Sequence, residues 1–183
     1  MQSSFLSLAG KRQSCRRYTN RPVEKEKLDI ILEAARIAPS ASNSQPWTII
    51  VVDDAAKVNA MANACVSNGI PINKFALQAP VIIVIVVEKP RTITRLAGWI
   101  KKKEFEWTDL GIVAEHICLQ ATEIGLGTCM IGWFDEKRVR QITGVPDKKR
   151  IGLVITLGYA PDDYRNRLKI RKPIPEIVKY NSY

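Results

Sequence analysis

The segment from Trp107 to Leu126 constrains the fold most, because its apolar residues occupy nearly every side of a helix. Leu110, Val113 and Ile117 recur at helical spacing on one broad face, and Cys118 extends the apolar character around the cylinder. A helix that is hydrophobic nearly all round must be buried on most of its sides. A chain of 183 residues supports one substantial core, but covering such a helix is difficult unless a second subunit helps. The sequence therefore predicts one domain, residues 1–183, and favours an oligomer.

Short apolar runs and amphipathic segments predict the remaining elements. The predicted strands are Trp47–Val52, Val81–Val87, Thr128–Gly132 and Ile151–Gly158. The other predicted helices begin near Pro22 and end at Pro39, or span Ala55–Cys65 and Asp135–Thr143. Strands and helices are mixed without strict alternation, which favours an α+β domain over a doubly wound parallel sheet. We expect the tail, Pro161–Tyr183, to run over a surface of its own subunit or around a partner.

The charge balance suggests an anionic partner. Lysine and arginine outnumber aspartate and glutamate by 28 to 18, which gives a net charge of +10. Nucleic acid, an anionic membrane surface or a phosphorylated small molecule would each satisfy that excess. Neither an RNA-binding signature nor a helix-turn-helix pattern accompanies the charge, so the sequence does not favour a nucleic-acid-binding module.

Cysteine and histidine usage argues against a zinc site. Cys15, Cys65, Cys118 and Cys129 are widely spaced, and His116 is the single histidine. Zinc ligands usually come as Cys-Cys or His-His pairs separated by about two to five residues, and this chain has no such pair. The first ten residues do not resemble a secretion signal, and no apolar run approaches the ~20 residues that span a bilayer. The sequence predicts no membrane association, a cytoplasmic location and reduced thiols.

Common phosphate-binding and nucleophile motifs are missing from the sequence. It has no G-x-G-x-x-G after a strand, no G-x-x-x-x-G-K-[ST] and no G-x-S-x-G. A Rossmann dinucleotide fold, a P-loop NTPase and a serine hydrolase are therefore not favoured.

Two basic segments are candidates for binding an anion. If residues 12–18 form a helical turn, Arg12 and Arg16 lie on one face with the Ser14 hydroxyl between them and can grip a phosphate. In an extended tail, Lys169 and Arg171 point the same way and form a second cationic clamp. Each segment could equally be a solvated basic stretch.

The loop Pro39–Trp47 is dense in short polar side chains and backbone amides. Such a loop can bind the polar edge of a planar heterocycle through amide donors and acceptors. It could also be an ordinary turn in which Ser42 and Asn43 cap the local backbone. Composition does not separate these two interpretations.

Taken together, these segments resemble the nitroreductase family of FMN-dependent oxidoreductases. The motifs that carry the resemblance occur in order along nearly the whole chain: R-x-S-x-R-x-Y at Arg12–Tyr18, A-P-S-A-S-N-S-Q-P-W at Ala38–Trp47, Asp109-Leu110-Gly111, G-L-G-T-C-M-I-G at Gly125–Gly132, and R-K-P at Arg171–Pro173. The resemblance implies an α+β fold around a mixed sheet flanked by helices. It also implies an intertwined homodimer with two FMN sites at the subunit interface, which would cover both the apolar helix and the tail.

The resemblance further implies which residues bind FMN. Contacts to the phosphate and ribityl chain are expected from Arg12, Ser14, Arg16, Lys169 and Arg171. Contacts around the ring are expected from Gln13 at its polar edge, from Pro39, Ser40, Ala41 and Asn43 of the partner subunit, from the backbone of Ile131 and Gly132 near N5, and from Asn73, whose register is open.

The implied activity is a ping-pong cycle in which NADH or NADPH reduces FMN and an electron-poor acceptor, such as a nitroaromatic or a quinone, then oxidises it. Because a flavin performs hydride transfer itself, no side chain is singled out as acid or base. Reductive dehalogenation, flavin fragmentation and flavin binding without turnover remain alternatives. The segment Glu88–Glu106, expected to form a small lid, leaves the acceptor and the choice between NADH and NADPH open. His116 and Trp107 are interpreted as packing residues.

Overall fold

The strand β2 (Val81–Val87), apolar at every position, lies in the interior of a four-stranded antiparallel sheet with the order β1-β2-β4-β3. The computed structural model describes residues 3–66, 72–90 and 103–183. The other strands are β1 (Trp47–Val52), β4 (Arg150–Gly158) and β3 (Gly127–Ile131). The α+β class is confirmed, but the mixed character expected of the sheet is limited, in the described residues, to one isolated parallel bridge between Ser14 and Thr128.

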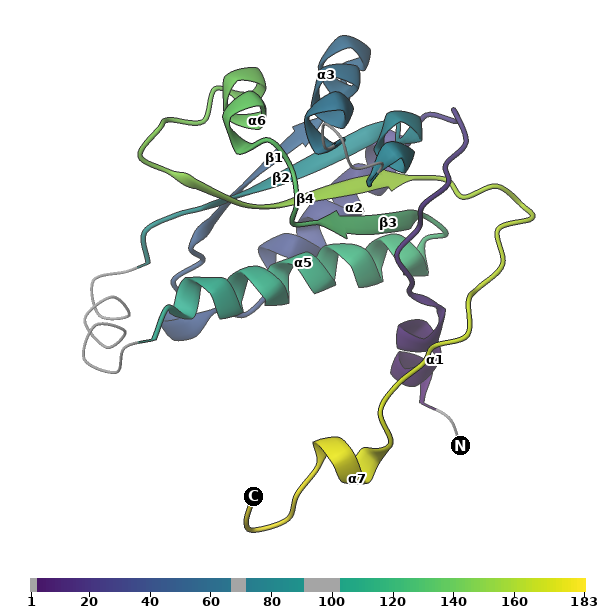
Figure 1. Cartoon of the computed structure of the whole chain (residues 1–183), viewed down its shortest axis with the longest axis vertical. Helices are drawn as coiled ribbons and strands as arrows, with labels where there is room; N and C mark the ends of the chain where they lie inside the picture. Colours follow the sequence, from purple (N-terminus) through teal and green to yellow (C-terminus); the bar gives the residue numbers. More distant parts are fainter. Residues whose placement is uncertain (1–2, 67–71, 91–102) are drawn as a thin grey trace.

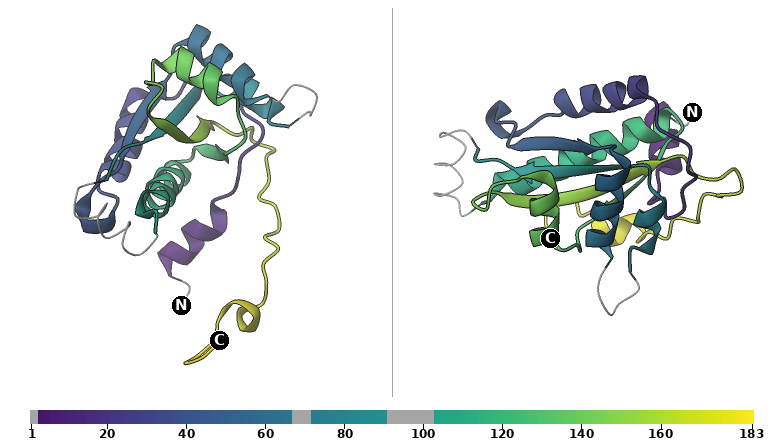
Figure 2. Two further views of the ribbon diagram at one scale, coloured as in Figure 1. Left: turned by 60° about the vertical axis from the view of Figure 1, so that its left-hand side comes forward. Right: turned by 90° about the horizontal axis from the view of Figure 1, so that it is seen from above.

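Helices cover both faces of this sheet (Figures 1 and 2). Alternate residues of β2 point to opposite sides, as in any strand. Val81, Ile83 and Ile85 pack in one cluster with α2 (Lys25–Arg36) and α5 (Phe105–Glu123). Ile82, Val84 and Val86 pack in the other, with α3 (Ala55–Cys65) and α6 (Glu136–Thr143). The result is three layers with two apolar cores, one on each face of the sheet.

The helix α5 packs closely against β4 through Gly152. A Cβ atom at Gly152 would lie 2.4 Å from Leu110 Cδ2, so any side chain at this position would force Leu110 to move. The apolar face of α5, including Leu110, Val113 and Ile117, is buried in its own chain. Its other sides, which carry His116, are half-buried. The helix is thus covered on one side, and the complete burial expected from its composition is not reached within one chain.

The structure shows the contacts of His116 and Trp107, which are interpreted from the sequence as packing residues. The Nδ1 atom of His116 lies 2.9 Å from the carbonyl oxygen of Ile112, one turn earlier in α5. The Trp107 ring packs against the first core, and the guanidinium carbon of Arg150 lies 4.6 Å from the ring centroid.

Both ends of the chain project from the layers on the same side (Figure 1). The N-terminal end is α1 (Ser4–Lys11), and the C-terminal tail carries the single turn α7 (Ile174–Ile177). The short 3-10 turns η1 (Ala41–Asn43) and η2 (Lys74–Gln78) complete the described elements. In the part of the chain that the structure describes, no helix is both long and apolar enough to cross a membrane.

The helical turn considered for residues 12–18 does not form. The helix α1 ends at Lys11, and Arg12 already has extended backbone with ψ 125°. Cys15 N donates to Thr128 O at 2.7 Å, which holds the segment beside β3 as an extended strand. A contact with a segment more than a hundred residues away therefore overrides the local spacing.

Candidate functional site

The N-terminal segment, residues 9–18, and the C-terminal tail, residues 161–183, lie side by side, although about 150 residues separate them in the sequence. Gln13 Nε2 donates to Asn166 Oδ1 at 2.8 Å, and Arg167 N donates to Gln13 Oε1 at 3.1 Å. Arg16 N donates to the Tyr164 hydroxyl at 2.9 Å. The Gln13 amide thus uses both its donor and its acceptor to hold the tail in place.

Three cations meet where the two segments join. Lys169 Nζ donates to the carbonyl oxygens of Arg12 and Ala9, the latter at 3.0 Å. Loss of hydration and the nearby charges of Arg12 and Arg171 hold the pKa of Lys169 below its usual value. Arg12 Nε also pairs with Glu115 Oε1 of α5 at 3.1 Å. We call Arg12, Lys169 and Arg171 the cation cluster.

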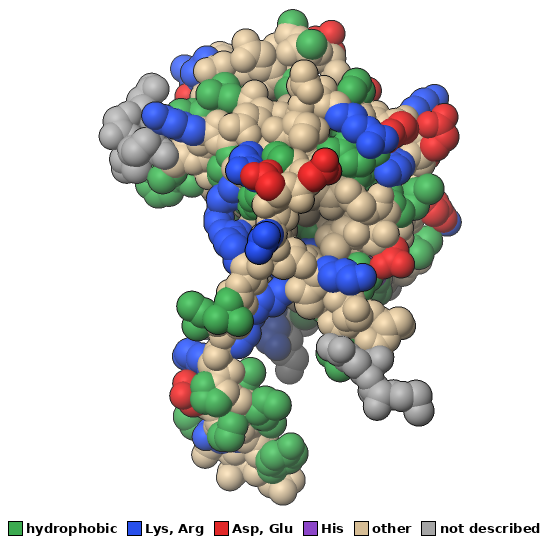
Figure 3. Space-filling model, turned by 90° about the vertical axis from the view of Figure 1, so that its right-hand side faces the viewer, with side chains coloured by type: hydrophobic (Ala, Val, Ile, Leu, Met, Phe, Trp, Pro, Cys, Tyr) green, Lys and Arg blue, Asp and Glu red, His purple; other side chains and the backbone are tan. Residues whose placement is uncertain are grey.

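Further basic side chains surround the cation cluster. Figure 3 shows lysine and arginine side chains gathered along the tail between the body and α7. The Arg167 guanidinium donates to Ser14 O at 2.7 Å. Burial raises the pKa of the Cys129 thiol, while the adjacent Arg16 and Ser14 lower it. Like charges gathered in this way repel one another, so the region favours a bound anion that offsets them.

The polar loop, Pro39–Trp47, contacts α5 at a different position from the cation cluster. Ala41 N donates to Asp109 Oδ1 at 3.0 Å, which fixes the loop against the second turn of α5. Glu115, which pairs with Arg12, follows Asp109 by six residues. Six residues of helix correspond to a rise of about 9 Å and a rotation of about 240°. The loop and the cation cluster therefore approach different faces of α5, and one chain does not bring them into one site.

The predicted ring contacts at β3 do meet one another. Ile131 is buried at the end of the strand, and Gly132, which follows it, is exposed. Asn73 Nδ2 donates to Trp133 O at 3.1 Å and to Cys65 O at 3.2 Å. Asn73 takes left-handed backbone with φ 60°, a conformation that asparagine tolerates better than most residues. The structure thus places Asn73 directly beside the segment that follows Ile131 and Gly132.

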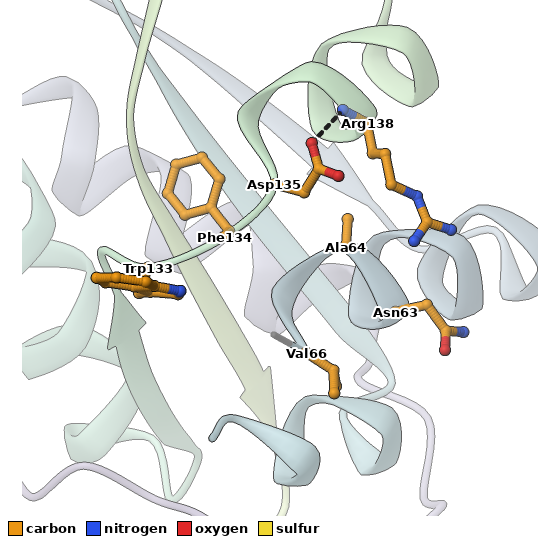
Figure 4. Close-up of a pocket in the computed structure, with 7 residues that line it drawn as sticks. All are labelled: Asn63, Ala64, Val66, Trp133, Phe134, Asp135 and Arg138. Carbon is orange, nitrogen blue, oxygen red and sulfur yellow. Dashed lines mark hydrogen bonds between the residues drawn. The ribbon is translucent and has the colours of Figure 1, made fainter. Parts of the chain in front are cut away.

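A pocket of about 160 Å³ opens beside the segment that follows Gly132. Figure 4 shows its lining residues, which come from the end of α3 and from the segment leading into α6: Asn63, Ala64, Val66, Trp133, Phe134, Asp135 and Arg138. The Trp133 side chain is 65% exposed, which is unusual for so large an aromatic group. The pocket therefore offers an uncovered aromatic surface beside Gly132.

The cysteines supply no ready nucleophile. Burial raises the pKa of Cys118 to about 11 and that of Cys65 to about 12, so both thiols stay protonated at neutral pH. Within residues 3–66, 72–90 and 103–183, no three histidine, cysteine, aspartate or glutamate side chains gather as metal ligands would. The predicted lid falls mainly on residues 91–102, which lie outside the described residues.

The family follows from comparison with known proteins. The family model described as "Nitroreductase family" matches residues 9–72 and 71–159. The chain belongs to the nitroreductase family. The match includes the N-terminal segment, the polar loop and β3, but it stops before the tail that carries Lys169 and Arg171.

Relatives of this family match nearly the full length. A Thermus thermophilus protein called "NADH dehydrogenase" is 30% identical, and the match covers 92% of this chain and 91% of its own length. A putative NADH dehydrogenase/NAD(P)H nitroreductase of Archaeoglobus fulgidus is 28% identical and covers 86% of each chain. The solved structure of an FMN-dependent nitroreductase from Clostridium difficile R20291 is 32% identical, with a TM-score of 0.77, and covers 96% of this chain and 98% of its own.

Sequence reasoning did not single out several residues of this region. Tyr164 and Arg167 hold the N-terminal segment, and Trp133 lines the pocket. Asp109 was named as part of a motif, but its role in anchoring the polar loop was not predicted. The basic stretch at 165–172 was a usable signal for Arg167. The position of Asp109 on the apolar face of the helix, in line with Val113 and Ile117, was the corresponding signal, because buried carboxylates are rare without a partner.

Proposed function

We propose that the chain, residues 1–183, acts as one FMN-binding oxidoreductase domain. It passes hydride from NADH or NADPH to an electron-poor acceptor such as a nitroaromatic or a quinone. Membership of the nitroreductase family supports this proposal, as do the relatives named for NAD(P)H and FMN.

The cation cluster is the observation that carries the proposal. Lys169 lies with its ammonium group between two backbone carbonyls and next to Arg12 and Arg171. A phosphate monoester, such as that of FMN, carries close to two negative charges and several acceptor oxygens. Arginine forks and a lysine point charge suit that group well. The residues present therefore fit the phosphate end of FMN, with Ser14 and Arg16 next to them for the ribityl chain.

The isoalloxazine ring would extend from this cluster toward the end of β3. Gly132 is exposed there, so backbone groups can approach the ring, and Asn73 lies beside them. When FMN is bound, the flavin supplies the hydride chemistry, and the protein binds it, orients it and limits access to it. Because the tail occupies the Gln13 amide, we assign Gln13 the task of holding the tail rather than contacting the ring directly.

The complete site requires a second copy of the chain. The loop residues Pro39, Ser40, Ala41 and Asn43 lie on a different face of α5 from the cation cluster, so they would serve the cofactor of a partner subunit. The half-buried sides of α5 and the exposed tail provide surfaces for such a homodimer. The acceptor would stack on the ring from the side of the Trp133 pocket, where an uncovered indole favours planar aromatic compounds.

The direct test of the site removes two cations and measures FMN binding. We expect the double variant Arg12→Ala/Arg171→Ala to bind FMN on the order of a hundredfold more weakly, because two charge-assisted contacts are lost. The matched control is Lys137→Ala/Lys148→Ala, which removes two exposed cations away from the cluster. Equal FMN affinity in the two double variants would refute the cation cluster as the phosphate site.

A further inference from the structure

Asp109 is a buried carboxylate in the otherwise apolar part of α5. Its side chain is 3% exposed, and its Oδ1 accepts the Ala41 N–H of η1 at 3.0 Å. Its Oδ2 is buried and has no hydrogen-bond partner within the described part of the chain. A buried carboxylate oxygen without a donor is destabilising, so the residue is a poor choice for the core alone. Its contact with the loop gives it a different use.

The loop that Asp109 holds has a strained backbone. Ser42 and Asn43 have φ values of 51° and 50°, and Gln45 has a φ of 47°. Left-handed backbone is unfavourable for side chains other than glycine, and such a conformation persists only where its surroundings enforce it. Gln45 N donates to Ser40 Oγ at 2.8 Å, which fixes the exposed side of the loop. Asp109 fixes the side of the loop that faces α5.

The same helix also holds the cation cluster, because Glu115 pairs with Arg12. Through Glu115 the helix α5 fixes its own subunit's phosphate site, and through Asp109 it fixes the loop offered to the other subunit's ring. A helix is stiff over this short distance, so the two positions are set relative to each other. This arrangement makes Asp109 a link between the two FMN sites of a dimer.

We propose that Asp109 is a positioning residue for cofactor binding: its carboxylate holds the Ala41 N–H so that the loop presents a fixed surface to the FMN of the partner subunit. This inference rests on the proposed function. It assigns no chemical step to Asp109, which acts on the cofactor through the loop.

The test compares FMN dissociation constants with thermal stability in the full-length protein. Asp109→Ala removes the acceptor, and we expect FMN binding to weaken roughly tenfold or more. Asp109→Asn keeps a carbonyl oxygen for the Ala41 N–H, so it should bind within about threefold of the unchanged protein. Val113→Ala, one turn further along α5, destabilises the same core without touching the loop and should keep the original affinity.

Two results would overturn the inference. One is an Asp109→Ala protein that binds FMN as tightly as Val113→Ala does at equal stability. The other is an Asp109→Asn protein that loses as much affinity as Asp109→Ala.

If Asp109→Ala does not fold, Ala41→Pro removes the donor instead, at a position where the preceding residue, Ser40, is already extended as a proline requires. Ala41→Pro should weaken FMN binding roughly tenfold, as Asp109→Ala would, because the same contact is lost. An Ala41→Pro protein that binds FMN as tightly as the unchanged protein would overturn the inference. An unchanged protein that binds no FMN would refute the proposed function itself.

Discussion

At the residue scale, Lys169 has two tasks in the proposed FMN phosphate site. Its ammonium group is held by two backbone carbonyls of the N-terminal segment, so it both fixes the tail and supplies charge. Partial burial and two neighbouring arginines make its charged form less favourable than in water, which lowers its pKa. A bound phosphate would reverse this effect by adding negative charge. Cofactor binding and the protonation of Lys169 should therefore be coupled.

That coupling predicts a pH dependence of FMN affinity. As pH rises through the lowered pKa of Lys169, the free protein loses a positive charge that the phosphate needs. We expect FMN binding to weaken at alkaline pH, and to do so at a lower pH than an ordinary lysine would cause. Lys169→Arg should remove this dependence, because arginine stays charged. FMN titrations of both proteins over the alkaline range measure it, and identical pH profiles would contradict the assignment.

The sequence predicted which residues of the N-terminal segment lie beside the tail better than it predicted their backbone conformation and contacts. The spacing of Arg12, Ser14 and Arg16 identified residues that do lie beside the tail, but the helical turn considered for them does not form. The extended form depends on the bond from Cys15 N to Thr128 O and on Gln13 holding Arg167. Both are long-range contacts that local spacing does not encode. The same limit hid the role of Asp109, whose partner lies in another segment.

At the scale of elements, a small polar network joins the start of α2 to the end of β4. The Tyr159 hydroxyl donates to Glu24 Oε2 at 2.5 Å, and Arg21 pairs with Glu24 Oε1 at 2.7 Å. Lys27 Nζ donates to the Tyr159 hydroxyl at 2.8 Å and to Ile124 O at 3.0 Å. The network thus ties α2 both to the sheet and to the end of α5.

This network predicts a contribution to acid stability. The Tyr159 hydrogen bond, together with Arg21, lowers the pKa of Glu24 from its usual 4.5 to about 2. A carboxyl whose pKa is lowered on folding stabilises the fold above its usual pKa and loses that contribution as pH falls from about 4.5 toward 2. Glu24→Gln should therefore lower the melting temperature at neutral pH and flatten its decline in acid.

The control for this prediction is Glu26→Gln, which removes an exposed carboxylate in the first turn of α2 that is not part of the network. Thermal melts of the three proteins across the acidic range provide the comparison. A Glu24→Gln protein whose acid profile matches that of the original chain would show that the network does not stabilise the fold.

Hydrophobic periodicity predicted most elements well. The strands β1 and β2 have the predicted bounds, and the apolar helix expected at Trp107–Leu126 is α5, Phe105–Glu123. Periodicity succeeds there because each face of the sheet has its own apolar core, so alternation and helical spacing agree with burial. It did not predict α1 or α7, in which no residue is buried in the single chain. These elements lack the burial that would give a clear pattern.

At the scale of the whole molecule, the tail carries a group of exposed apolar side chains. Leu168 is 90% exposed, Ile170 86% and Tyr180 83%. Ile174 and Ile177 of α7 are also exposed, at 68% and 65%. Apolar side chains gathered in this way indicate an interaction surface rather than a solvated tail. A second copy of the chain is the partner that the proposed function requires.

The tail therefore predicts a measurable effect on assembly. Ile174→Ser/Ile177→Ser removes apolar surface from α7 but leaves every member of the cation cluster in place. We expect the full-length protein to sediment as a dimer and the variant to dissociate at concentrations at least about tenfold higher, because less apolar area is buried. Leu77→Ser, at a site 50% exposed on η2, serves as the control. A variant that dimerises as tightly as this control would argue against the tail as an interface.

The net charge of +10 is partly explained at this scale. Arg12, Arg16, Arg167, Lys169 and Arg171 gather where the tail meets the N-terminal segment, which suits one small anion per site. The sequence predicted an anionic partner but could not locate it, because the two basic segments lie at opposite ends of the chain. The identity of the acceptor is not predicted either. Most of the lid expected to cover it, residues 91–102, lies outside the described residues.

Anaerobic reduction of the reconstituted protein tests the central claim most directly. The purified chain is saturated with FMN, freed of excess cofactor and mixed with NADH or NADPH while its visible absorbance is followed. The account predicts one FMN retained per chain, loss of the flavin absorbance with at least one of the two nicotinamide cofactors, and its return when a nitroaromatic or quinone is added. A chain that retains no FMN, or whose bound FMN is reduced by neither NADH nor NADPH, would contradict it.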